Sequence, residues 1–374
     1  MTNIKYFTFY LPQYHSIPEN DAWWELGFTE WSNVRRATKR FNSHFQPVIP
    51  GELGYYDLSD IDIQRKQSEL ARQYGVDGFV YYSYWFGNGK QLLQKPAEQL
   101  LVNKDIQQPF CFCWANETWK GVWFGASQGK TLIEQSYPGL NDLKAYFKYL
   151  LPFFIDERYI RINEKPLFIV YIADNLPDKS MFLDVFREFA FKSGLKGLHI
   201  LSARSKNPKA DIDIGFDGII GAEFSKLRYA YQNPSRNRYQ RFMRNMMDAV
   251  GLGHNLDFET RHKPLVLDYE SAVKFLIPDL VNDFDYHPVA VPNWDNSPRS
   301  GNRSMVFANS TPEKWADHLF QQSKYALNNV NPVVFIKSWN EWAEGNYLEP
   351  DARYGRSYLE KTLVSKLRAS AFES

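Results

Sequence analysis

VVFIKSWNEWAEG, residues 333–345, is the stretch that decides the fold. It opens with an apolar, β-branched run and ends in a group of polar and aromatic residues. A short apolar run bounded by polar residues predicts a buried strand. The polar group then falls at the carboxyl end of that strand, and the same arrangement recurs along the chain.

Eight such runs, rich in β-branched and aromatic residues, alternate with longer helix-like segments. The runs are 4–10, 78–84, 109–114, 166–172, 198–204, 217–223, 288–294 and 333–339. This alternation is typical of repeated βα units around a parallel sheet. Eight units predict an α/β fold of the (β/α)8, or TIM, barrel class.

Helices are expected between the runs. They are clearest at 61–74, 141–154, 180–192 and 312–328, and the last begins with Thr311 as N-cap and Pro312 at the first helical position.

Two segments break the repeat. Residues 205–216 are too short for a comfortable crossover helix, and 224–287 are too long for a plain loop. No linker rich in proline or serine separates a second domain. We therefore expect a single catalytic domain over residues 1–374, in which residues 224–287, inserted after the sixth strand, form a lid or subdomain.

Composition narrows the class of protein. Charged residues make up 23% of the 374 residues and the formal net charge is +1, so a nucleic acid or another general polyanion is disfavoured as a partner. The 11 tryptophans and 23 tyrosines favour a groove that stacks sugars or bases, with core packing as the rival explanation.

The sequence carries no signal-peptide pattern at its start and no run of 18 apolar residues. We expect a cytoplasmic protein without a transmembrane segment, while peripheral contact with a membrane stays open.

Polar and aromatic residues gather at the carboxyl ends of the predicted strands. In barrel enzymes the active site assembles at that end. We therefore expect one shared cleft, with Glu341, Glu344, Glu117 and Trp294 opening into the same pocket. The full set of expected substrate-binding residues is Tyr10, Gln13, His15, Glu30, Trp31, Tyr84, Trp85, Asn116, Glu117, Trp119, Glu223, Asn293, Trp294, Asn340 and Trp342.

Glu341 and Glu344 are the candidate catalytic pair. If the chain leaves the strand for a loop or a helical turn here, their i, i+3 spacing places both carboxyl groups on one face. Two carboxyl groups in an aromatic site can have their pKa values pushed apart, so that one acts as acid and the other as base. This is the equipment of glycoside hydrolysis. The alternative is a solvated acidic turn.

Glu117 and Glu30 are two further acids that could belong to the site. Glu117, next to Asn116, is a second candidate for the acid role. Glu30 and Trp31 follow the tryptophan pair at 23–24, and this loop either shapes a binding wall or folds back as a polar loop with an aromatic plug.

Metal and cofactor motifs are missing from the sequence. His15 and His44 have no metal-ligand spacing, and no H-E-x-x-H, calcium-loop or P-loop pattern is present, so we expect neither metal nor cofactor. Asp-x-Asp triplets at 60–62, 211–213 and 283–285 are weak candidates for a divalent ion on a sugar-nucleotide diphosphate, and the first is explained equally well by acids at a helix start.

Residues 224–247 contain six lysines or arginines and no acid. This basic stretch predicts a partly helical lid bordering the cleft, where it would bind a phosphate or an anionic glycan. The alternative is a solvated helix face balanced by acids elsewhere.

Six long blocks of the sequence carry a resemblance to a known family. They are FYLPQYHSIPENDAWWELGFTEWSNV (9–34), HFQPVIPGELGYYDL (44–58), GFVYYSYWFGNGKQLL (78–93), CFCWANETW (111–119), RYIRINEKPLFIVY (158–171) and KSWNEWAEGNYLEP (337–350). The chain resembles the WbsX family of polysaccharide-locus proteins, which are similar to family 99 glycoside hydrolases. The resemblance implies a (β/α)8 barrel and a place in bacterial surface-polysaccharide metabolism, often in lipopolysaccharide O-antigen clusters.

The resemblance also implies roles for the two glutamates. In family 99 both acids lie in a strand-end motif like NEWAEG, which would make Glu341 the base and Glu344 the general acid/base. The base deprotonates the sugar's own 2-hydroxyl, which attacks C1 to give a 1,2-anhydro sugar that water later opens. This chain has Ala343 where the endo-mannosidases tend to have histidine, so mannosidase specificity is not carried over.

The expected function is that of a glycan-active enzyme, a retaining endo-type glycoside hydrolase or transglycosylase. Its substrate would be a surface oligo- or polysaccharide (O-antigen or capsule) or its precursor, either anionic or linked to a lipid diphosphate. The alternative is a glycosyltransferase that uses a nucleotide- or lipid-linked sugar, a label that members of the resembled family often carry. A catalytically silent glycan-binding module is a third reading.

Overall fold

The computed structural model describes residues 4–121, 130–232, 263–279 and 282–372. A parallel sheet closes on itself in the order β12-β10-β9-β8-β4-β2-β1-β15-β13. Its strands are β1 (Lys5–Tyr10), β2 (Gly78–Trp85), β4 (Phe110–Trp114), β8 (Lys165–Val170), β9 (His199–Ala203), β10 (Gly218–Ile220), β12 (Tyr286–His287), β13 (Val289–Ala290) and β15 (Val333–Ile336).

The seventh strand position of the barrel, or seventh stave, is divided at Pro288 into β12 and β13. β12 pairs with β10 on one side, and β13 pairs with β15 on the other. Pro288 has no N–H to donate, while its carbonyl accepts from the backbone N–H of Phe335 at 3.0 Å. The two short strands therefore act as one interrupted stave that closes the ring, and the predicted (β/α)8 barrel is confirmed.

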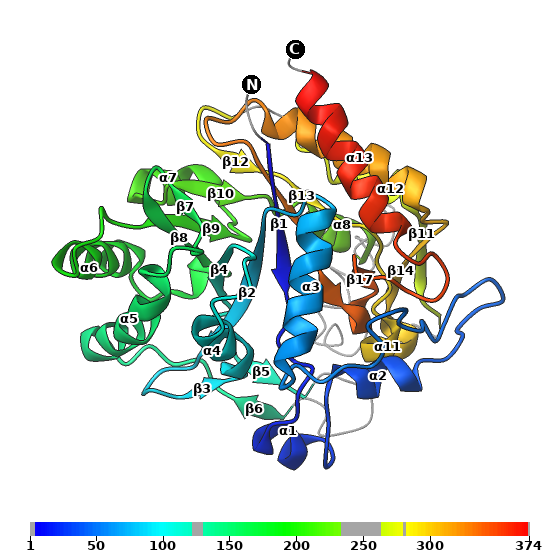
Figure 1. The fold of residues 1–374 in the computed structure, drawn as a ribbon, viewed down its shortest axis with the longest axis horizontal. Coiled ribbons are helices and arrows are strands. Elements are labelled where there is room, and N and C mark those ends of the chain that lie inside the picture. Colours follow the sequence, from blue (N-terminus) through cyan, green and yellow to red (C-terminus); the bar gives the residue numbers. More distant parts are fainter. Residues whose placement is uncertain (1–3, 122–129, 233–262, 280–281, 373–374) are drawn as a thin grey trace, which may run out of the picture.

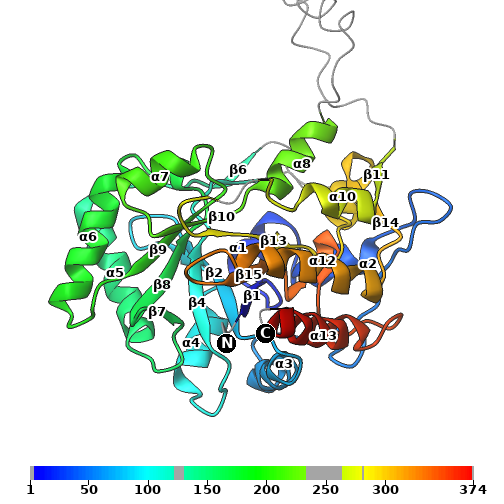
Figure 2. The same ribbon diagram turned by 90° about the horizontal axis from the view of Figure 1, so that it is seen from above.

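Helices cover the outside of the barrel (Figures 1 and 2). They are α3 (Ile61–Gln73), α4 (Lys95–Val102), α5 (Leu140–Phe154), α6 (Lys179–Lys192), α7 (Pro208–Ile214), α12 (Pro312–Ala326) and α13 (Ser357–Phe372). The four helices expected from the sequence are present within one or two residues of their predicted ends. The Thr311 side chain caps α12 by accepting from the Lys314 N–H at 3.4 Å.

The expectation that 205–216 holds no crossover helix was wrong. α7 fits into this segment because its start and stop signals are strong. The Asn207 side chain accepts from the Ala210 N–H at 3.3 Å, Pro208 occupies the first turn, and Gly215 ends the helix at φ 121°. A seven-residue helix is enough to bridge β9 and β10.

Smaller elements follow the barrel strands in the loops between strands and helices, and α1 lies beyond the end of the barrel toward which β1 runs (Figure 1). They are α1 (Pro18–Trp23), α2 (Glu30–Arg36), β3 (Gln91–Leu92), β5 (Trp119–Lys120), β6 (Thr131–Ile133), the 3-10 turn η1 (Ala173–Asn175), α8 (Glu223–Gln232), β11 (Leu265–Asp268), α10 (Tyr269–Phe275), α11 (Ser297–Ser300), the 3-10 turn η3 (Gly301–Arg303), β14 (Met305–Ala308), β16 (Asn340–Glu341), the 3-10 turn η4 (Trp342–Glu344) and β17 (Asn346–Tyr347). β7 (Arg161–Ile162) pairs antiparallel with β8.

The long insertion follows β10, as expected. It contains α8, β11 and α10, and β11 pairs in parallel with β14, which comes after the seventh stave. Residues 233–262 lie outside the described residues, and Arg236, Arg238 and Arg241 of the basic stretch are among them. A lid formed by 224–287 therefore stays a prediction.

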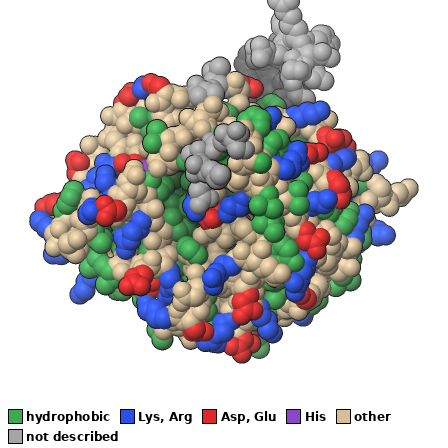
Figure 3. All heavy atoms as spheres, turned by 45° about the horizontal axis from the view of Figure 1, so that its top comes forward, with side chains coloured by type: hydrophobic (Ala, Val, Ile, Leu, Met, Phe, Trp, Pro, Cys, Tyr) green, Lys and Arg blue, Asp and Glu red, His purple; other side chains and the backbone are tan. Residues whose placement is uncertain are grey.

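Much of the aromatic excess is core packing. Trp114, Trp315, Trp339 and Trp342 are among the largest fully buried side chains. On the face shown in Figure 3, lysines and arginines lie interspersed with acids, in keeping with the small net charge. Within the described ranges, no helix combines the length and apolar character that a membrane span requires.

Two buried histidines make the fold sensitive to acid. His287 lies on β12, and burial lowers the pKa of its imidazole to about 4. His318 lies on α12, where burial lowers its pKa to about 3, and its Nε2 accepts from the Val291 N–H at 3.2 Å. Both rings are therefore held neutral in the folded protein.

The free energy of unfolding should fall as the pH drops from about 6.5, the pKa of an unfolded histidine, toward 4. Because the folded pKa values are depressed, the stabilisation is complete above the unfolded pKa and is lost below it. Chemical denaturation across this range measures the slope. His287→Phe has a ring of similar size that cannot be protonated, so it should flatten the slope; an unchanged slope would contradict this account.

Candidate active site

A cavity of about 740 Å³ opens at the carboxyl ends of the barrel strands. Several of the residues expected in the cleft line it together. They are Gln13, Tyr84, Glu117, Trp119, Trp294, Glu341 and Glu344. The four residues expected to share one pocket thus do so.

Glu341 and Glu344 reach the cavity because the chain turns directly after β15. Glu341 ends the short strand β16, and Glu344 closes the 3-10 turn η4. Gly345 then reverses the chain at φ 66°, and a Cβ atom there would lie 2.6 Å from the Asp295 backbone nitrogen. A glycine is therefore required at the point that places both carboxyl groups on one side.

Two largely buried cations hold the acid pair, with side-chain exposures of 11% for Arg299 and 14% for Lys337. Lys337 Nζ lies 3.1 Å from Glu341 Oε2 and 3.7 Å from Glu344 Oε2. Arg299 Nη1 lies 2.8 Å from Glu344 Oε1 and 3.7 Å from Glu341 Oε1. The Ser338 hydroxyl also donates to Glu341 Oε2 at 2.7 Å. Each carboxyl group therefore faces both cations.

Burial and charge act in opposite directions on these groups. Burial raises the pKa of Glu341, the Lys337 ammonium opposes that rise, and the neighbouring Glu344 carboxyl adds to it. Burial lowers the pKa of Lys337, but Glu341, Tyr171 and Glu344 together raise it more, so that its pKa lies above the usual value. Lys337 is therefore a permanent cation beside the acid pair.

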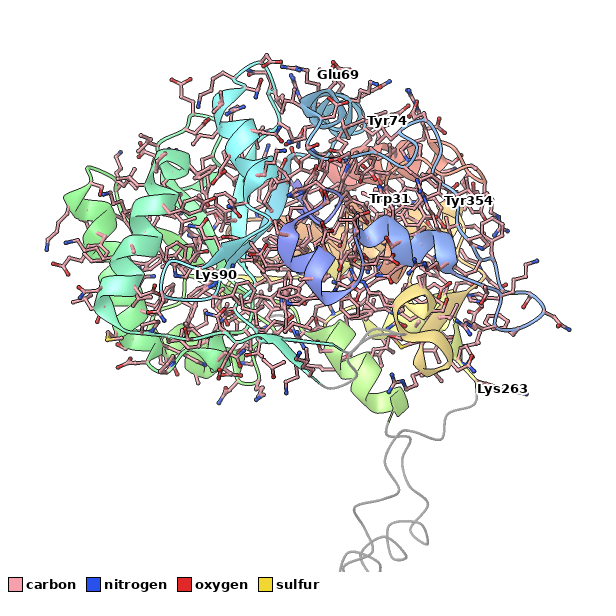
Figure 4. The ribbon with its side chains drawn as sticks, turned by 90° about the horizontal axis from the view of Figure 1, so that it is seen from below. Trp31, Glu69, Tyr74, Lys90, Lys263 and Tyr354 are labelled. Atoms are coloured by element: carbon pink, nitrogen blue, oxygen red, sulfur yellow. The ribbon has the colours of Figure 1, made fainter. Side chains whose placement is uncertain are left out.

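Glu30 lies behind Arg299 rather than in a binding wall. It is the first residue of α2 and is fully buried, and its Oε2 accepts from Arg299 Nε at 3.1 Å and lies 3.0 Å from Nη2. Trp31 is also buried, and its Nε1 donates to the Tyr56 carbonyl at 2.7 Å. Figure 4 labels it on the side of α2 that faces the body of the protein. The expectation that these two residues line the cleft is corrected: Glu30 and Trp31 fold back as a polar group with an aromatic plug, while Trp24 of the same loop lines the cavity.

Two other expected residues, Tyr10 and Trp85, do not line the cavity because their side chains lie on the outer face of their strands. Side chains alternate along a strand, so Phe9 and Tyr84 line the cavity while Tyr10 and Trp85 point outward. The Tyr10 hydroxyl donates to Gln67 Oε1 on α3 at 2.7 Å. Trp85 Nε1 donates to Asp142 on α5 at 3.0 Å.

Four of the remaining expected residues form hydrogen bonds with neighbouring protein groups outside the cavity. Asn116 accepts from the Ile172 N–H at 2.9 Å and donates to its carbonyl at 2.9 Å. Asn340 does the same with Leu11, at 2.8 and 3.0 Å. Glu223 accepts from the Tyr286 hydroxyl at 2.5 Å. Trp342 Nε1 donates to Glu349 at 2.6 Å. None of these four side chains, nor those of His15 and Asn293, lines the cavity.

The structure adds cavity residues that the sequence reasoning did not single out. They are Tyr82, Lys120, Tyr171, Arg204, Arg299 and Lys337. Trp24, from the tryptophan pair, and Phe224, the first residue of the stretch expected to border the cleft, also line the cavity. A signal existed for Lys337, because a lysine two positions after Phe335 continues the inward face of an apolar strand. No local pattern marks Arg299.

Arg204 stands on the cavity wall with a strained backbone. Its φ is 51°, in the left-handed region that an arginine seldom adopts. Its guanidinium lies over the Tyr171 ring, 5.1 Å from the centroid, and Nη1 is 3.7 Å from Glu117 Oε2. Burial raises the pKa of Glu117, and Arg204 opposes that rise.

Comparison with known proteins gives the family. Residues 6–362 match the family described as Glycosyltransferase WbsX. The chain belongs to the WbsX family. Two curated relatives, both the uncharacterised protein WxcX of Xanthomonas campestris pv. campestris, are 36% and 35% identical over 364 residues. The match covers 96% of this WbsX-family chain and 49% of each relative, so the chain spans about half their length.

Solved structures share the WbsX-family chain's fold. The family 99 endo-α-mannosidase from Bacteroides thetaiotaomicron, in complex with BIS-TRIS-propane, is 15% identical with a TM-score of 0.58, and the match covers 100% of both chains. A protein described as glycoside hydrolase-like is 13% identical with a TM-score of 0.58, covering 98% of this chain and 94% of that one. The expected likeness to family 99 is thus confirmed for the fold.

Asn340→Leu should destabilise the protein by about 2–5 kcal/mol, because both backbone groups of Leu11 would lose a buried partner. Urea denaturation measures the change. Asn340→Asp is the matched comparison: its carboxyl group would be fully buried and can replace both bonds only when it is protonated, so its loss should shrink as the pH is lowered. A loss that does not depend on pH would contradict the two-sided tether.

Proposed function

We propose that this protein is a retaining, endo-type glycoside hydrolase or transglycosylase acting on a bacterial surface polysaccharide, O-antigen or capsule, or on its precursor. The observation that carries the proposal is the acid pair Glu341 and Glu344, held by Lys337 and Arg299 on the wall of an aromatic cavity. Membership of a family named for glycosyl transfer supports a glycan as substrate. We place the activity in the cytoplasm, and it needs no cofactor.

Glu341 is suited to the role of base. Lys337 and Ser338 both engage its Oε2, so the carboxylate is fixed in orientation and its Oε1 edge lies toward Arg299, at 3.7 Å. A fixed carboxylate can remove the proton of a sugar 2-hydroxyl while the resulting oxygen attacks C1. The bond from C1 to the leaving oxygen breaks in the same step.

Glu344 is suited to the role of acid. Its side chain is 19% exposed, against 7% for Glu341, so it is the more open of the two carboxyls to the cavity. It would give its proton to the leaving oxygen and leave a 1,2-anhydro sugar. Glu344 would then take a proton from water or from a sugar acceptor, whose oxygen opens the anhydro ring at C1 while the proton on Glu341 returns to O2.

Aromatic side chains around the pair would form sugar subsites. Trp24, Trp119, Tyr84 and Trp294 line the cavity, and Phe224 packs on Trp294 with ring centroids 4.3 Å apart. Flat rings bury the apolar faces of sugar units. A cavity open to solvent at this end of the barrel suits an internal bond of a chain as well as a terminal one.

The second candidate is a glycosyltransferase that uses a nucleotide- or lipid-linked sugar. The family's name favours it, and so do Lys120 and Arg204 on the cavity wall, since both can pair with a diphosphate. Product analysis distinguishes the two functions. A hydrolase releases new reducing ends from polysaccharide alone, whereas a transferase requires the activated donor.

Glu341→Gln and Glu344→Gln should each lower turnover by about 10²- to 10⁴-fold while the fold is retained, because the amide keeps the shape but cannot transfer a proton. A substrate with an activated leaving group should partly rescue Glu344→Gln and not Glu341→Gln. Turnover is measured on the host's own surface polysaccharide with products identified by mass.

A 2-deoxy substrate provides the control for this route. The native enzyme should fail to cleave it, because the attacking hydroxyl is missing. Efficient cleavage, or a glycosyl ester trapped on a carboxylate such as Glu117, would establish the ordinary covalent retaining mechanism instead. Glycan binding without turnover, unchanged by loss of either glutamate, would favour a silent binding module.

Arg204 supports an anionic substrate, either an acidic sugar or a sugar linked to a lipid diphosphate. Arg204→Met should weaken binding of pyrophosphate or glucuronate about tenfold and leave glucose binding unchanged, because methionine keeps the stack on Tyr171 and removes the charge. Calorimetric titration at low salt measures this. Arg353→Met, which removes an arginine stacked on Tyr354 outside the cavity, is the control. Equal binding of both anions by native protein and Arg204→Met would contradict the expectation.

A further inference from the structure

Glu30 is a buried carboxyl group with no part in the mechanism above. It is fully buried at the start of α2 and does not line the cavity. Its contact with the acid pair runs through Arg299, whose Nε and Nη2 face Glu30 while Nη1 faces Glu344 and Glu341. Arg299 is thus shared between a hidden acid and the proposed catalytic acids.

The charges in this cluster do not balance. Three carboxyl groups, Glu30, Glu341 and Glu344, surround two cations, Arg299 and Lys337. With every group ionised, the cluster would carry one net negative charge in a site largely removed from water, which is costly. One bound proton removes the imbalance.

The geometry indicates which carboxyl groups hold that proton. Burial raises the pKa of Glu30, and the two Arg299 N–H groups that face its Oε2 oppose that rise and favour the ionised form. Glu30 Oε1 has no partner among the described residues that could accept a bond from a carboxyl proton. Glu341 and Glu344 face the same two cations and repel each other, and Glu344 opens to the cavity.

We propose that Glu30, acting through Arg299, keeps one proton on the Glu341–Glu344 pair. Glu30 is a positioning residue: its negative charge occupies one side of Arg299 and so limits how much positive charge the pair receives. If Glu30 were neutral, Arg299 and Lys337 would balance two ionised carboxylates, and the acid would be lost. The inference rests on the proposed function, which needs one protonated and one ionised carboxyl group.

Other titratable groups near the cluster do not change this charge count. They are Tyr14, Tyr82, Tyr84, Tyr171 and Glu117. Burial raises the pKa of all four tyrosines, so their hydroxyls stay neutral. Glu117 has its own cation in Arg204, at 3.7 Å.

Carbon-13 NMR of labelled glutamate carboxyl groups tests the inference on the full chain without a substrate. Glu341→Gln and Glu344→Gln assign the pair's signals. The pair titrates in two steps, each with its own apparent pKa. Glu30→Gln should lower the higher of these two pKa values by about one unit or more, since the substitution keeps the shape of the side chain and removes its charge. Arg299→Met should shift the same titration upward, so two variants with opposite expected signs protect the test against misfolding of either one.

Two further variants complete the design. Glu30→Asp keeps the charge and should restore most of the native titration. Glu25→Gln removes the acid of the exposed Glu25–Arg36 ion pair, just before α2, and should leave the pair's titration unchanged. Where turnover is measurable, the alkaline limb of the pH profile should move to lower pH in Glu30→Gln and recover in Glu30→Asp.

A pair titration in Glu30→Gln equal to that of the native protein would overturn the inference, because the proton would then reside on Glu30 or be absent. The NMR reading stands even if the native protein cleaves no glycan. Lack of cleavage counts against the proposed function, whereas an unmoved titration counts against the role of Glu30.

Discussion

A single guanidinium, largely shielded from water and surrounded by three carboxyl groups, organises the cavity end of this barrel. Arg299 comes from α11, after the seventh stave; Glu30 comes from α2, after the first; and Glu341 and Glu344 come from β16 and η4, after the last. Three loops are thus tied at Arg299, and the Asp295 N–H before α11 also donates to the Glu344 carbonyl at 2.8 Å. Removing one partner of such a buried network typically costs about 3–5 kcal/mol, because the remaining charges stay buried. A rigid arrangement of the acids follows from that penalty.

The fold could be predicted from the sequence because its signals are local. Each barrel strand is a short apolar run, and the helices carry their own caps, such as Thr311 and Asp60, whose side chains accept from backbone N–H groups of their first turns. The acid pair could also be predicted, since strand, turn and glycine are contiguous in residues 333–345. The alternation of side chains along a strand also predicts which strand residues face the cavity. Tyr84 and Trp85 are neighbours in sequence and face opposite sides of the sheet.

The rest of the site could not be predicted, because it depends on contacts between residues far apart in the chain. Glu30 and Arg299 are separated by 269 positions, and nothing near either one in the sequence announces the other. Asn340 and Leu11 are separated by 329. Polar residues at strand ends predict substrate contacts, yet Asn116 and Asn340 use their amides to hold neighbouring loops. A buried amide that bridges backbone groups and one that awaits a hydroxyl group look alike in a sequence.

Pro288, which divides the seventh strand position of the barrel, leaves short hydrogen-bonded ladders on both sides of that position. β12 and β13 each offer two residues to a single neighbour, whereas β2 pairs with β4 over five. A ladder this short adds little resistance to separation, so cooperative opening of the barrel would begin beside Pro288 rather than at the long ladders opposite. Val289, just past the proline, lines the cavity. The shortest ladders of the barrel therefore lie under the cavity, and, with the proposed function, a glycan chain bound across them would stabilise the barrel at that place.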